Sequence, residues 1–517
     1  MAEQVMESKL WSITDILRGH MDANEYKSYM LSFIFYKYLS ENVEKTVQEV
    51  GQDEEKLVRE KIGYYIPKEY YFKSIIDKVN NDEYILDLLH TSLKAIEESI
   101  NKDIKDPLNI FEDLDLETTK LGKTKEARNT IIGKVLLKLD EVDFRLEDTE
   151  TDVLGDAYEY LIGMFAATAG KKGGEFYTPQ TVSTILARIV SHGKETIKKA
   201  YDPTCGSGSL LLRISKETNV EEYRGQELNT TTYNLARMNL MLHNVPTTKF
   251  DIRQGNTLEE PQFLDERFDA IVSNPPYSAH WSSSKEYLKE DPRFNEYDKL
   301  APKSKADYAF IQHMLYLLAD DGIMTAVLPH GVLFRGSGEA SIRKHIIEKN
   351  YLDAVIGLPA NLFYGTGIPT MIYVMKKNRS LDEPVLFIDA SEEFEKGKKQ
   401  NILTDEHVDK IVDTYVNREE IERYSYLASM DEIIENDFNL NIPRYVDTFI
   451  PEPEIDLDEV HDEICRIDAE MEKIDKELLK YCNELGIKPP FPVKDDSYMT
   501  STGEESKDDD GLDQWIN

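Results

Sequence analysis

The chain has 517 residues and a formal net charge of −37, with 40% hydrophobic and 31% charged residues. These values predict about two to four globular domains with ample core and exclude a small disulfide-stapled scaffold. We expect no membrane span, signal peptide or transit peptide, because no apolar run is long enough and the opening is polar. Three cysteines without CxxC spacing indicate a reducing compartment, so we expect a cytoplasmic protein without a zinc site.

The acidity argues at first against nucleic acid as a partner, because phosphate binding normally requires a basic surface. The charge is unevenly distributed, however. Residues 1–170, 171–380, 381–450 and 451–517 carry net charges of −14, +2, −11 and −14. A nearly neutral segment therefore lies inside a very acidic chain, and such a change in charge indicates a domain boundary.

Residues 1–165 are predicted to form an N-terminal helical domain, because their apolar residues recur at helical spacing. One stripe is aromatic and comprises Tyr26, Tyr29, Phe33 and Tyr36. Such a stripe is more often the core of a helical bundle than a stacking platform for nucleic acid, so we interpret it as core.

Residues 166–450 are predicted to form an α/β domain with a doubly wound sheet. Short apolar runs alternate there with stretches of helical period. The runs are KKAYDPTCGSG, EEYRGQEL, KFDIRQGN, FDAIVSNPPY, GIMTAVLP, LDAVIGLP and TMIYVMKK. In such a sheet the ligand lies at the carboxyl ends of the strands.

Residues 451–488 are predicted to form a long helix with a coiled-coil seam. Nine apolar residues from Leu457 to Leu485 follow an unbroken 3-4 spacing over about four heptads. A narrow apolar seam of this kind needs another helix to cover it. Residues 489–517 form a polar, acidic tail that we expect to be flexible.

A loop rich in small residues, Asp202–Ser209, follows the first predicted strand and precedes an apolar helix start. Small residues let the backbone approach a ligand closely, and a helix N-terminus offers free N–H groups. Glu227 ends the next predicted strand, about 20 residues further on, where a carboxylate can accept hydrogen bonds from ribose hydroxyls. The loop is neither GxGxxG nor GxxxxGK[ST], which favours a nucleoside cofactor without phosphates. The alternative interpretation of the loop is a plain strand-to-helix turn, and the alternative interpretation of Glu227 is a solvated surface glutamate.

The tetrapeptide Asn274-Pro275-Pro276-Tyr277 directly follows another predicted strand. Two prolines remove two backbone donors and fix the turn, so carbonyl oxygens are free to accept from a ligand. Asn274 adds an acceptor and Tyr277 adds a stacking face. Together they suit a planar amine with two N–H donors, such as the exocyclic amine of adenine.

With these motifs in order, the chain resembles an amino-methyltransferase that uses S-adenosylmethionine, and specifically the modification subunit of a type I restriction-modification system. Further segments match the family pattern: Glu175–Pro179 (EFYTP), Ala306–Phe310 (ADYAF), Leu328–Phe334 (LPHGVLF) and Asn439–Tyr445 (NLNIPRY). The resemblance runs from about residue 5 to residue 485. It implies the Rossmann-like, doubly wound mixed sheet of S-adenosylmethionine-dependent methyltransferases, with an N-terminal helical domain and a C-terminal coiled-coil helix.

The resemblance also implies roles for individual residues. The residues expected to hold the cofactor are Glu175, Phe176, Tyr177, Thr178, Pro179, Gln180, Asp202, Gly206, Ser207, Gly208, Ser209, Glu227 and Asn256. Asn274, Pro275, Pro276 and Tyr277 are expected to be catalytic. Gln180 stands where the family often has arginine, and Asn256 where many relatives have aspartate. Cys205 is interpreted as a packing residue and not as a nucleophile.

The implied reaction is methyl transfer from S-adenosylmethionine to N6 of an adenine flipped out of DNA, without a metal. A separate specificity subunit, docked on the C-terminal helix and typically bound by two modification subunits, would read the target sequence, and a restriction subunit would complete the complex. We therefore expect this chain alone to bind DNA weakly. The alternative activity is protein glutamine methylation, but in that family the tetrapeptide lies near the end of the chain.

Overall fold

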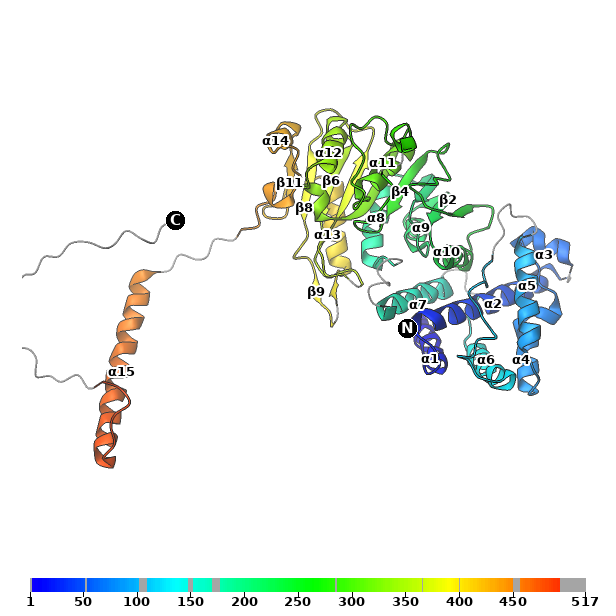
Figure 1. The fold of residues 1–517 in the computed structure, drawn as a ribbon, viewed down its shortest axis with the longest axis horizontal. Coiled ribbons are helices and arrows are strands. Elements are labelled where there is room, and N and C mark those ends of the chain that lie inside the picture. The colour runs from blue at the N-terminus through cyan, green and yellow to red at the C-terminus, as the bar shows by residue number, and fades with distance from the viewer. Residues whose placement is uncertain are drawn as a thin grey trace, which may run out of the picture. The chain divides into compact units, whose positions relative to one another are not determined.

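The computed structural model describes residues 2–51, 54–101, 109–146, 152–169, 177–283, 286–364, 366–398, 400–449 and 456–492 (Figure 1). The chain divides into two compact units, Met1–Thr448 and Phe449–Asn517. Each unit is described below by itself. No helix among the described residues is long and apolar enough to cross a membrane.

The N-terminal part of the first unit is helical. Its helices are α1 (Ala2–Arg18), α2 (Ala23–Val50), α3 (Glu55–Ile62), α4 (Phe72–Asn80), α5 (Leu86–Asn101), α6 (Lys125–Asp140) and α7 (Val153–Ala169), with a 3-10 turn at Lys68–Tyr70. The aromatic stripe of α2 is core, as predicted: Tyr26, Tyr29, Phe33 and Tyr36 are all at most 4% exposed.

A nine-stranded sheet forms the rest of the first unit, in the order β11-β8-β6-β7-β5-β4-β1-β2-β3. The strands are β1 (Thr196–Asp202), β2 (Asn219–Glu227), β3 (Phe250–Gln254), β4 (Phe268–Ser273), β5 (Leu318–Pro329), β6 (Leu352–Gly357), β7 (Thr370–Lys376), β8 (Val385–Asp389) and β11 (Ser425–Ala428). β1 to β5 are parallel, whereas β7 is antiparallel to β5 and β6. The order reverses at β1, so the loops after β1 and β4 meet at a switch point.

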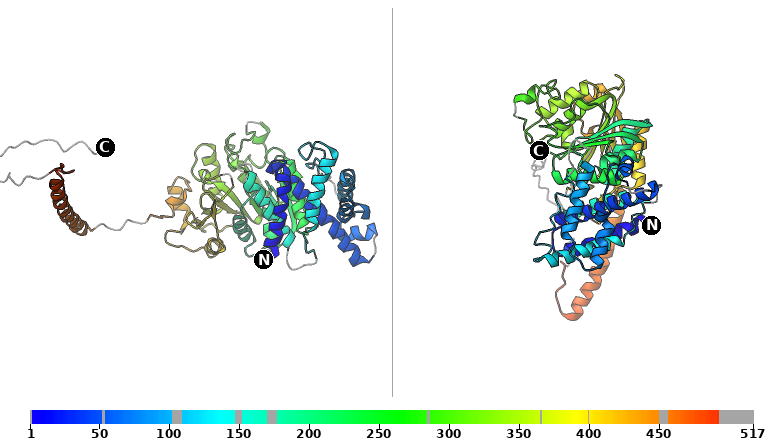
Figure 2. Two further views of the ribbon diagram at one scale, coloured as in Figure 1. Left: turned by 90° about the horizontal axis from the view of Figure 1, so that it is seen from below. Right: turned by 90° about the vertical axis from the view of Figure 1, so that its right-hand side faces the viewer.

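Helices cover both faces of this sheet, which confirms the doubly wound mixed fold. One face packs against α8 (Gln180–Ser191), α9 (Ser209–Ser215), α10 (Thr230–Leu242) and α13 (Asp405–Asn417), and the other against α11 (Asp307–Leu317) and α12 (Gly338–Glu348). Neighbouring strand residues point to opposite faces, so Ala200 lies in one core cluster and Tyr201 in the other. Figure 2 gives two further views of these layers.

All seven apolar runs singled out in the sequence are strands, β1 to β7. Sequence reasoning missed β8 and β11, which extend the sheet beyond β6, and the short hairpin of β9 (Glu395–Lys396) and β10 (Asn401–Ile402). β11 has only four residues, too few for a periodic signal.

The helical part and the sheet share one continuous core. Residues of α1, α2 and α7 belong to the same hydrophobic cluster as residues of α8, α10 and β1. The Tyr38 hydroxyl of α2 donates to the Met241 carbonyl of α10 at 3.0 Å. The domain boundary at residue 165 stays a prediction.

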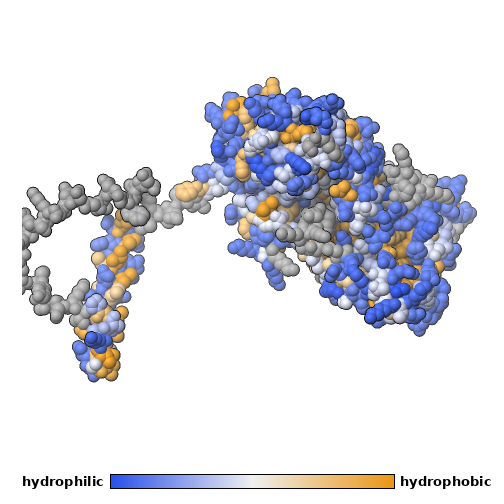
Figure 3. All heavy atoms as spheres, in the orientation of Figure 1, coloured by the Kyte–Doolittle hydropathy of each residue, from blue (hydrophilic) through white to orange (hydrophobic). Residues whose placement is uncertain are grey.

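The second unit contains one long helix, α15 (Leu457–Leu485), with Asp456 as its N-cap. The predicted seam lies along one side of it, visible in Figure 3 as an orange stripe. Its nine apolar side chains are 39% to 77% exposed within the described part of the chain. The seam is therefore an uncovered apolar surface, as a coiled-coil strand without its partner would present.

Candidate active site

The loop after β1 is held in a tight curve beside β2 and β4. Gly206 and Gly208 both have positive φ, at 53° and 78°, a conformation that suits glycine. The Thr204 N–H donates to Asp202 Oδ1 at 2.9 Å, and the Thr204 and Ser273 hydroxyls are 2.9 Å apart. Ser209 opens α9, so the free N–H groups of that helix face the end of the sheet.

Two carboxylates meet at this loop. Asp202 ends β1 and Glu227 ends β2, and Glu227 Oε2 accepts from the Gly206 N–H at 3.0 Å. Burial, followed by the nearby Glu227 carboxylate, raises the pKa of Asp202 to about 8, despite hydrogen bonds from Thr204. Burial also raises the pKa of Glu227. Such shifts mark a site where a ligand with hydrogen-bond donors would compensate the buried acids.

The Asn-Pro-Pro-Tyr loop follows β4 directly and lies at the same edge. Asn274 Nδ2 donates to Thr178 Oγ1 at 3.0 Å, and the Tyr277 hydroxyl donates to Asn274 Oδ1 at 2.8 Å. The Tyr277 ring meets Phe363 edge to face, with ring centroids 6.2 Å apart. The Asn274 amide is thus oriented from both ends.

The EFYTP segment reaches the same place from a different part of the chain. Glu175 and Phe176 lie outside the described residues. Thr178 is 9% exposed and bonds Asn274, and Pro179 is the N-cap of α8. Gln180 turns away to α7, where its Nε2 donates to Glu159 Oε2 at 2.6 Å.

Asn256 lies in the loop after β3, on the far side of Glu227. Its Oδ1 accepts from the Leu258 N–H at 3.1 Å and the Glu259 N–H at 3.3 Å. The side chain therefore holds its own turn in this conformation. The Asn256 backbone and amide still border the cavity that contains Glu227.

Two cavities border these residues, and Asn274 lines both. The smaller, of about 20 Å³, lies among Tyr177, Thr178, Asp202 and the loop residues Cys205–Ser207. The larger, of about 750 Å³, includes Glu227, Asn256 and Pro276. The structure thus brings candidate residues from five separate segments to these two cavities, whereas Pro179, Gln180, Gly208, Pro275 and Tyr277 line neither of them.

Sequence reasoning missed two apolar residues of the larger cavity, Leu228 and Phe310. Leu228 follows Glu227 directly and is 66% exposed. The sequence position of Leu228, directly after the candidate Glu227, was the signal that could have found it. Phe310 belongs to the ADYAF segment, whose approach to β2 only the fold reveals.

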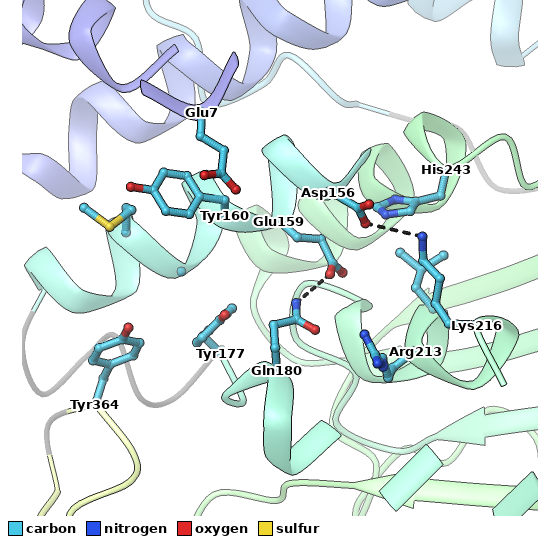
Figure 4. A pocket seen from close by; sticks show the side chains of 13 residues that line it. Glu7, Asp156, Glu159, Tyr160, Tyr177, Gln180, Arg213, Lys216, His243 and Tyr364 are labelled. Carbon is cyan, nitrogen blue, oxygen red and sulfur yellow. Dashed lines mark hydrogen bonds and ion pairs between the residues drawn. The ribbon is translucent and has the colours of Figure 1, made fainter. Parts of the chain in front are cut away.

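A third cavity, of about 380 Å³, lies behind the EFYTP segment (Figure 4). In Figure 4 Gln180 points toward Glu159, and Lys216 points toward Asp156, an ion pair of 3.3 Å. Glu159 Oε1 and Arg213 Nε are buried there without a hydrogen-bond partner among the described residues. No group of three or more His, Cys, Asp or Glu side chains in the described ranges could hold a metal ion.

Cys205 is buried within the cofactor loop, with its Sγ against Gly225. Burial raises the pKa of this thiol well above its usual value. A thiol that keeps its proton is a poor nucleophile, which supports the interpretation of Cys205 as a packing residue.

The fold and the loops at its carboxyl edge define a methyltransferase. The model of the N-6 DNA Methylase family matches residues 149–453, and that of the HsdM N-terminal domain matches residues 6–139. The chain belongs to the N-6 DNA methylase family, and it is an adenine-specific DNA methyltransferase of the kind that serves as methylase subunit in type I restriction-modification systems.

The sequence similarity to relatives extends over most of both chains. The chain is 37% identical to the type I restriction enzyme MpnII methylase subunit of Mycoplasma pneumoniae, over 87% of this chain and 91% of that one. It is 32% identical to the MjaVII methylase subunit of Methanocaldococcus jannaschii, covering 90% and 81%. A crystal structure of a type I methyltransferase subunit from Streptococcus thermophilus is 44% identical and superposes with a TM-score of 0.80, covering 86% of this chain and all of that chain.

Proposed function

We propose that the two cavities joined at Asn274 form one cleft for S-adenosylmethionine, and that Asn274 presents a target adenine to its methyl group. The observation that carries this proposal is that Asn274 lines both cavities. A ligand lying across them would have its middle, where the sulfonium methyl sits, next to the Asn274 amide.

The smaller cavity would take the methionine end of the cofactor. Asp202 would accept hydrogen bonds from the ammonium group, and the small loop residues Gly206–Ser209 would line the carboxylate and sulfonium portion. Thr178 and the neighbouring residues Tyr177 and Pro179 would close this end. Glu175, Phe176 and Gln180 are proposed cofactor contacts on the basis of the family resemblance alone.

The larger cavity would take the adenosine. Glu227 would accept from the ribose hydroxyls. Its Oε1 and Oε2 each accept one hydrogen bond, from the Asn229 and Gly206 N–H groups, and a carboxylate keeps further lone pairs for a ligand. Asn256 would contact the cofactor's adenine amine. Leu228 and Phe310 would supply apolar faces for the adenine ring, which explains an exposed leucine in a cleft.

When bound, the cofactor supplies an electrophilic methyl group. Adenine N6 is a weak nucleophile, because its lone pair is delocalised into the ring. The Asn274 Oδ1 and the Pro275 carbonyl would accept its two hydrogens and orient the lone pair toward the methyl carbon, while Tyr277 stacks on the base. The rate would come mainly from alignment, and the base must first flip out of the duplex.

The apolar seam of α15 would dock on helices of a specificity subunit. Two modification subunits would bind each specificity subunit. A restriction subunit would complete the complex, which acts on double-stranded DNA. The seam is flanked by acidic residues: Glu463, Glu470, Glu477 and Glu484 on one side, and Asp468 and Asp475 on the other. Two copies of such a helix would repel each other, so the partner helices should carry basic residues beside their own seam. We propose that the complex works in the cytoplasm and protects host DNA.

The test uses the purified chain and its cognate complex, with tritium-labelled S-adenosylmethionine and unmethylated genomic DNA. We expect methyl label in DNA, recovered as N6-methyladenine, with the complex and little with the chain alone. Label found in protein glutamine would point to the alternative activity. Absence of label from DNA with an intact complex would refute the proposal.

A further inference from the structure

Two motifs singled out in the sequence, ADYAF and LPHGVLF, meet at the end of the catalytic loop. Asp307, in the first motif, opens α11 and is completely buried. Its Oδ1 accepts a hydrogen bond from the Ser278 N–H at 2.8 Å, and Ser278 directly follows Tyr277. The Asp307 carboxylate is therefore hydrogen-bonded to the backbone one residue beyond the catalytic tetrapeptide.

The hydrogen bond from the Ser278 N–H stabilises an unfavourable backbone conformation at Ser278. Its φ of 49° lies in the left-handed region, which residues other than glycine adopt only at an energetic cost. The chain must turn there to leave the Asn-Pro-Pro-Tyr loop. The Asp307 hydrogen bond favours this turn, and so fixes where the Pro276 and Tyr277 backbone lies.

Arg335 neutralises Asp307 from the other side. Its Nη1 lies 3.2 Å from Asp307 Oδ2 and 3.3 Å from Glu339 Oε1. Both carboxylates are almost inaccessible, since Asp307 and Glu339 side chains are 0% and 2% exposed. Without the arginine, two buried negative charges would lie close together, a strongly unfavourable arrangement.

The LPHGVLF segment, which directly precedes Arg335, leaves space beside Gly331 for the Arg335 guanidinium. A Cβ on Gly331 would lie 2.4 Å from the Arg335 guanidinium, so the guanidinium occupies the space that any other residue would fill. The segment itself is held by its carbonyls: Val332 accepts from Tyr308 at 2.9 Å and from Arg343 at 3.0 Å. These hydrogen bonds hold the backbone that precedes Arg335.

We propose that Asp307 and Arg335 are positioning residues for methyl transfer: they hold the turn at Ser278 and thereby keep Asn274–Tyr277 in the geometry that receives the target base. Neither residue lines the smaller cavity or bonds to Asn274. The proposal rests on the catalytic role proposed for Asn274–Tyr277. It assigns the ADYAF and LPHGVLF segments to the catalytic step and not to cofactor binding.

The experiment compares variants within the intact complex. Asp307→Ala removes the acceptor of the Ser278 N–H, whereas Asp307→Asn keeps an oxygen for this hydrogen bond. Gly331→Ala displaces the Arg335 guanidinium without changing either positioning residue, and Arg335→Lys keeps the positive charge. Gly336→Ala is the control, because a Cβ there meets no atom within 4 Å.

Three readouts are needed: S-adenosylhomocysteine affinity by calorimetry, melting temperature, and single-turnover methylation of unmethylated genomic DNA at saturating cofactor. We expect Asp307→Ala and Gly331→Ala to slow methyl transfer about ten- to hundred-fold with cofactor affinity unchanged, because small misplacements of reacting groups carry such penalties. Asp307→Asn and Arg335→Lys should recover part of the rate, and Gly336→Ala should match the wild type.

The outcomes separate this inference from the proposed function. An inactive wild-type complex refutes the proposed function. An active wild type with unchanged rates in Asp307→Ala and Gly331→Ala overturns the positioning role. A parallel loss of cofactor affinity and rate, or a lower melting temperature with an unchanged rate, overturns it as well, because either result indicates a merely structural role.

Discussion

The Tyr277 hydroxyl donates a hydrogen bond to Asn274 Oδ1 at 2.8 Å, so two side chains of the tetrapeptide are bonded to each other. The same Oδ1 is the atom proposed to accept from adenine N6. An amide oxygen has two lone pairs, so one bond leaves room for another. With Thr178 accepting from Nδ2, the Asn274 amide is held at both its nitrogen and its oxygen.

We therefore infer two separable roles for Tyr277, an orienting hydroxyl and a stacking ring. We expect Tyr277→Phe to keep most methyl transfer activity, because the ring and the Thr178 bond remain. Tyr277→Ala should weaken productive binding of the target about ten- to hundred-fold, since stacking on an aromatic ring contributes about 1–3 kcal/mol per base. Steady-state methylation kinetics of both variants on the same DNA would decide; equal losses would contradict the stacking role.

Asn274→Ala should bind cofactor but fail to transfer methyl. It removes the acceptor for N6, and losing one such polar contact to the reacting group lowers turnover by about 10²–10³. Gly336→Ala is the control, because a Cβ at that position meets no atom within 4 Å. Calorimetry with S-adenosylhomocysteine and a single-turnover assay separate the two steps. Undiminished transfer by Asn274→Ala would refute its assignment.

The buried Asp202 predicts a pH dependence of stability in the cofactor-free chain. Burial and the nearby Glu227 carboxylate raise its pKa from 3.8 to about 8. Between these values the folded state keeps a proton that the unfolded state releases, so the free energy of unfolding falls as pH rises. Asp202→Asn cannot ionise and should gain stability relative to the wild type as pH rises from 5 to 8.

Melting temperatures of the two proteins across that range test this prediction. Asp382→Asn is the control, because Asp382 is exposed and its loss removes the same charge. A constant difference between wild type and Asp202→Asn at every pH would contradict a raised pKa at this position.

Cys205 should resist alkylation in the folded protein. It is buried with a raised pKa, and Cys482 is also buried, whereas Cys465 is exposed. Iodoacetamide at pH 8 should therefore modify Cys465 first, as peptide mass mapping would reveal. Cys205→Ala should retain methyl transfer close to the wild-type rate; loss of transfer with cofactor binding intact would revive a nucleophilic role.

The seam of α15 should be required for assembly and dispensable for cofactor binding. Met471, a seam residue, is 55% exposed, so Met471→Asp should leave the fold intact while placing a charge in the docking surface. Ala469→Asp adds the same charge on the opposite side of the helix and serves as the control. Size-exclusion chromatography with the specificity subunit should show loss of the complex for Met471→Asp alone. Intact assembly would refute docking through this seam.

Much of this molecule follows from local sequence pattern. The seven strands β1 to β7, the buried aromatic stripe of α2 and the apolar seam of α15 were all predicted, because alternation, helical period and heptads are local signals. The strands β8 and β11, of which β11 lies at the sheet edge, were missed, because each is short and pairs with a strand far away along the chain.

The sequence by itself determined the class of chemistry, because Asn274–Tyr277, the Asp202–Ser209 loop and Glu227 carry their functional groups in fixed order. It also determined that residues 171–380 are nearly neutral, so a net charge of −37 for the whole chain does not exclude a DNA substrate. Only the tertiary structure decided which side chains meet. The bonds of Asn274 to Thr178, and of Ser278 to Asp307, join residues 96 and 29 positions apart. Such contacts depend on the strand order and crossovers of the sheet, which no local pattern encodes.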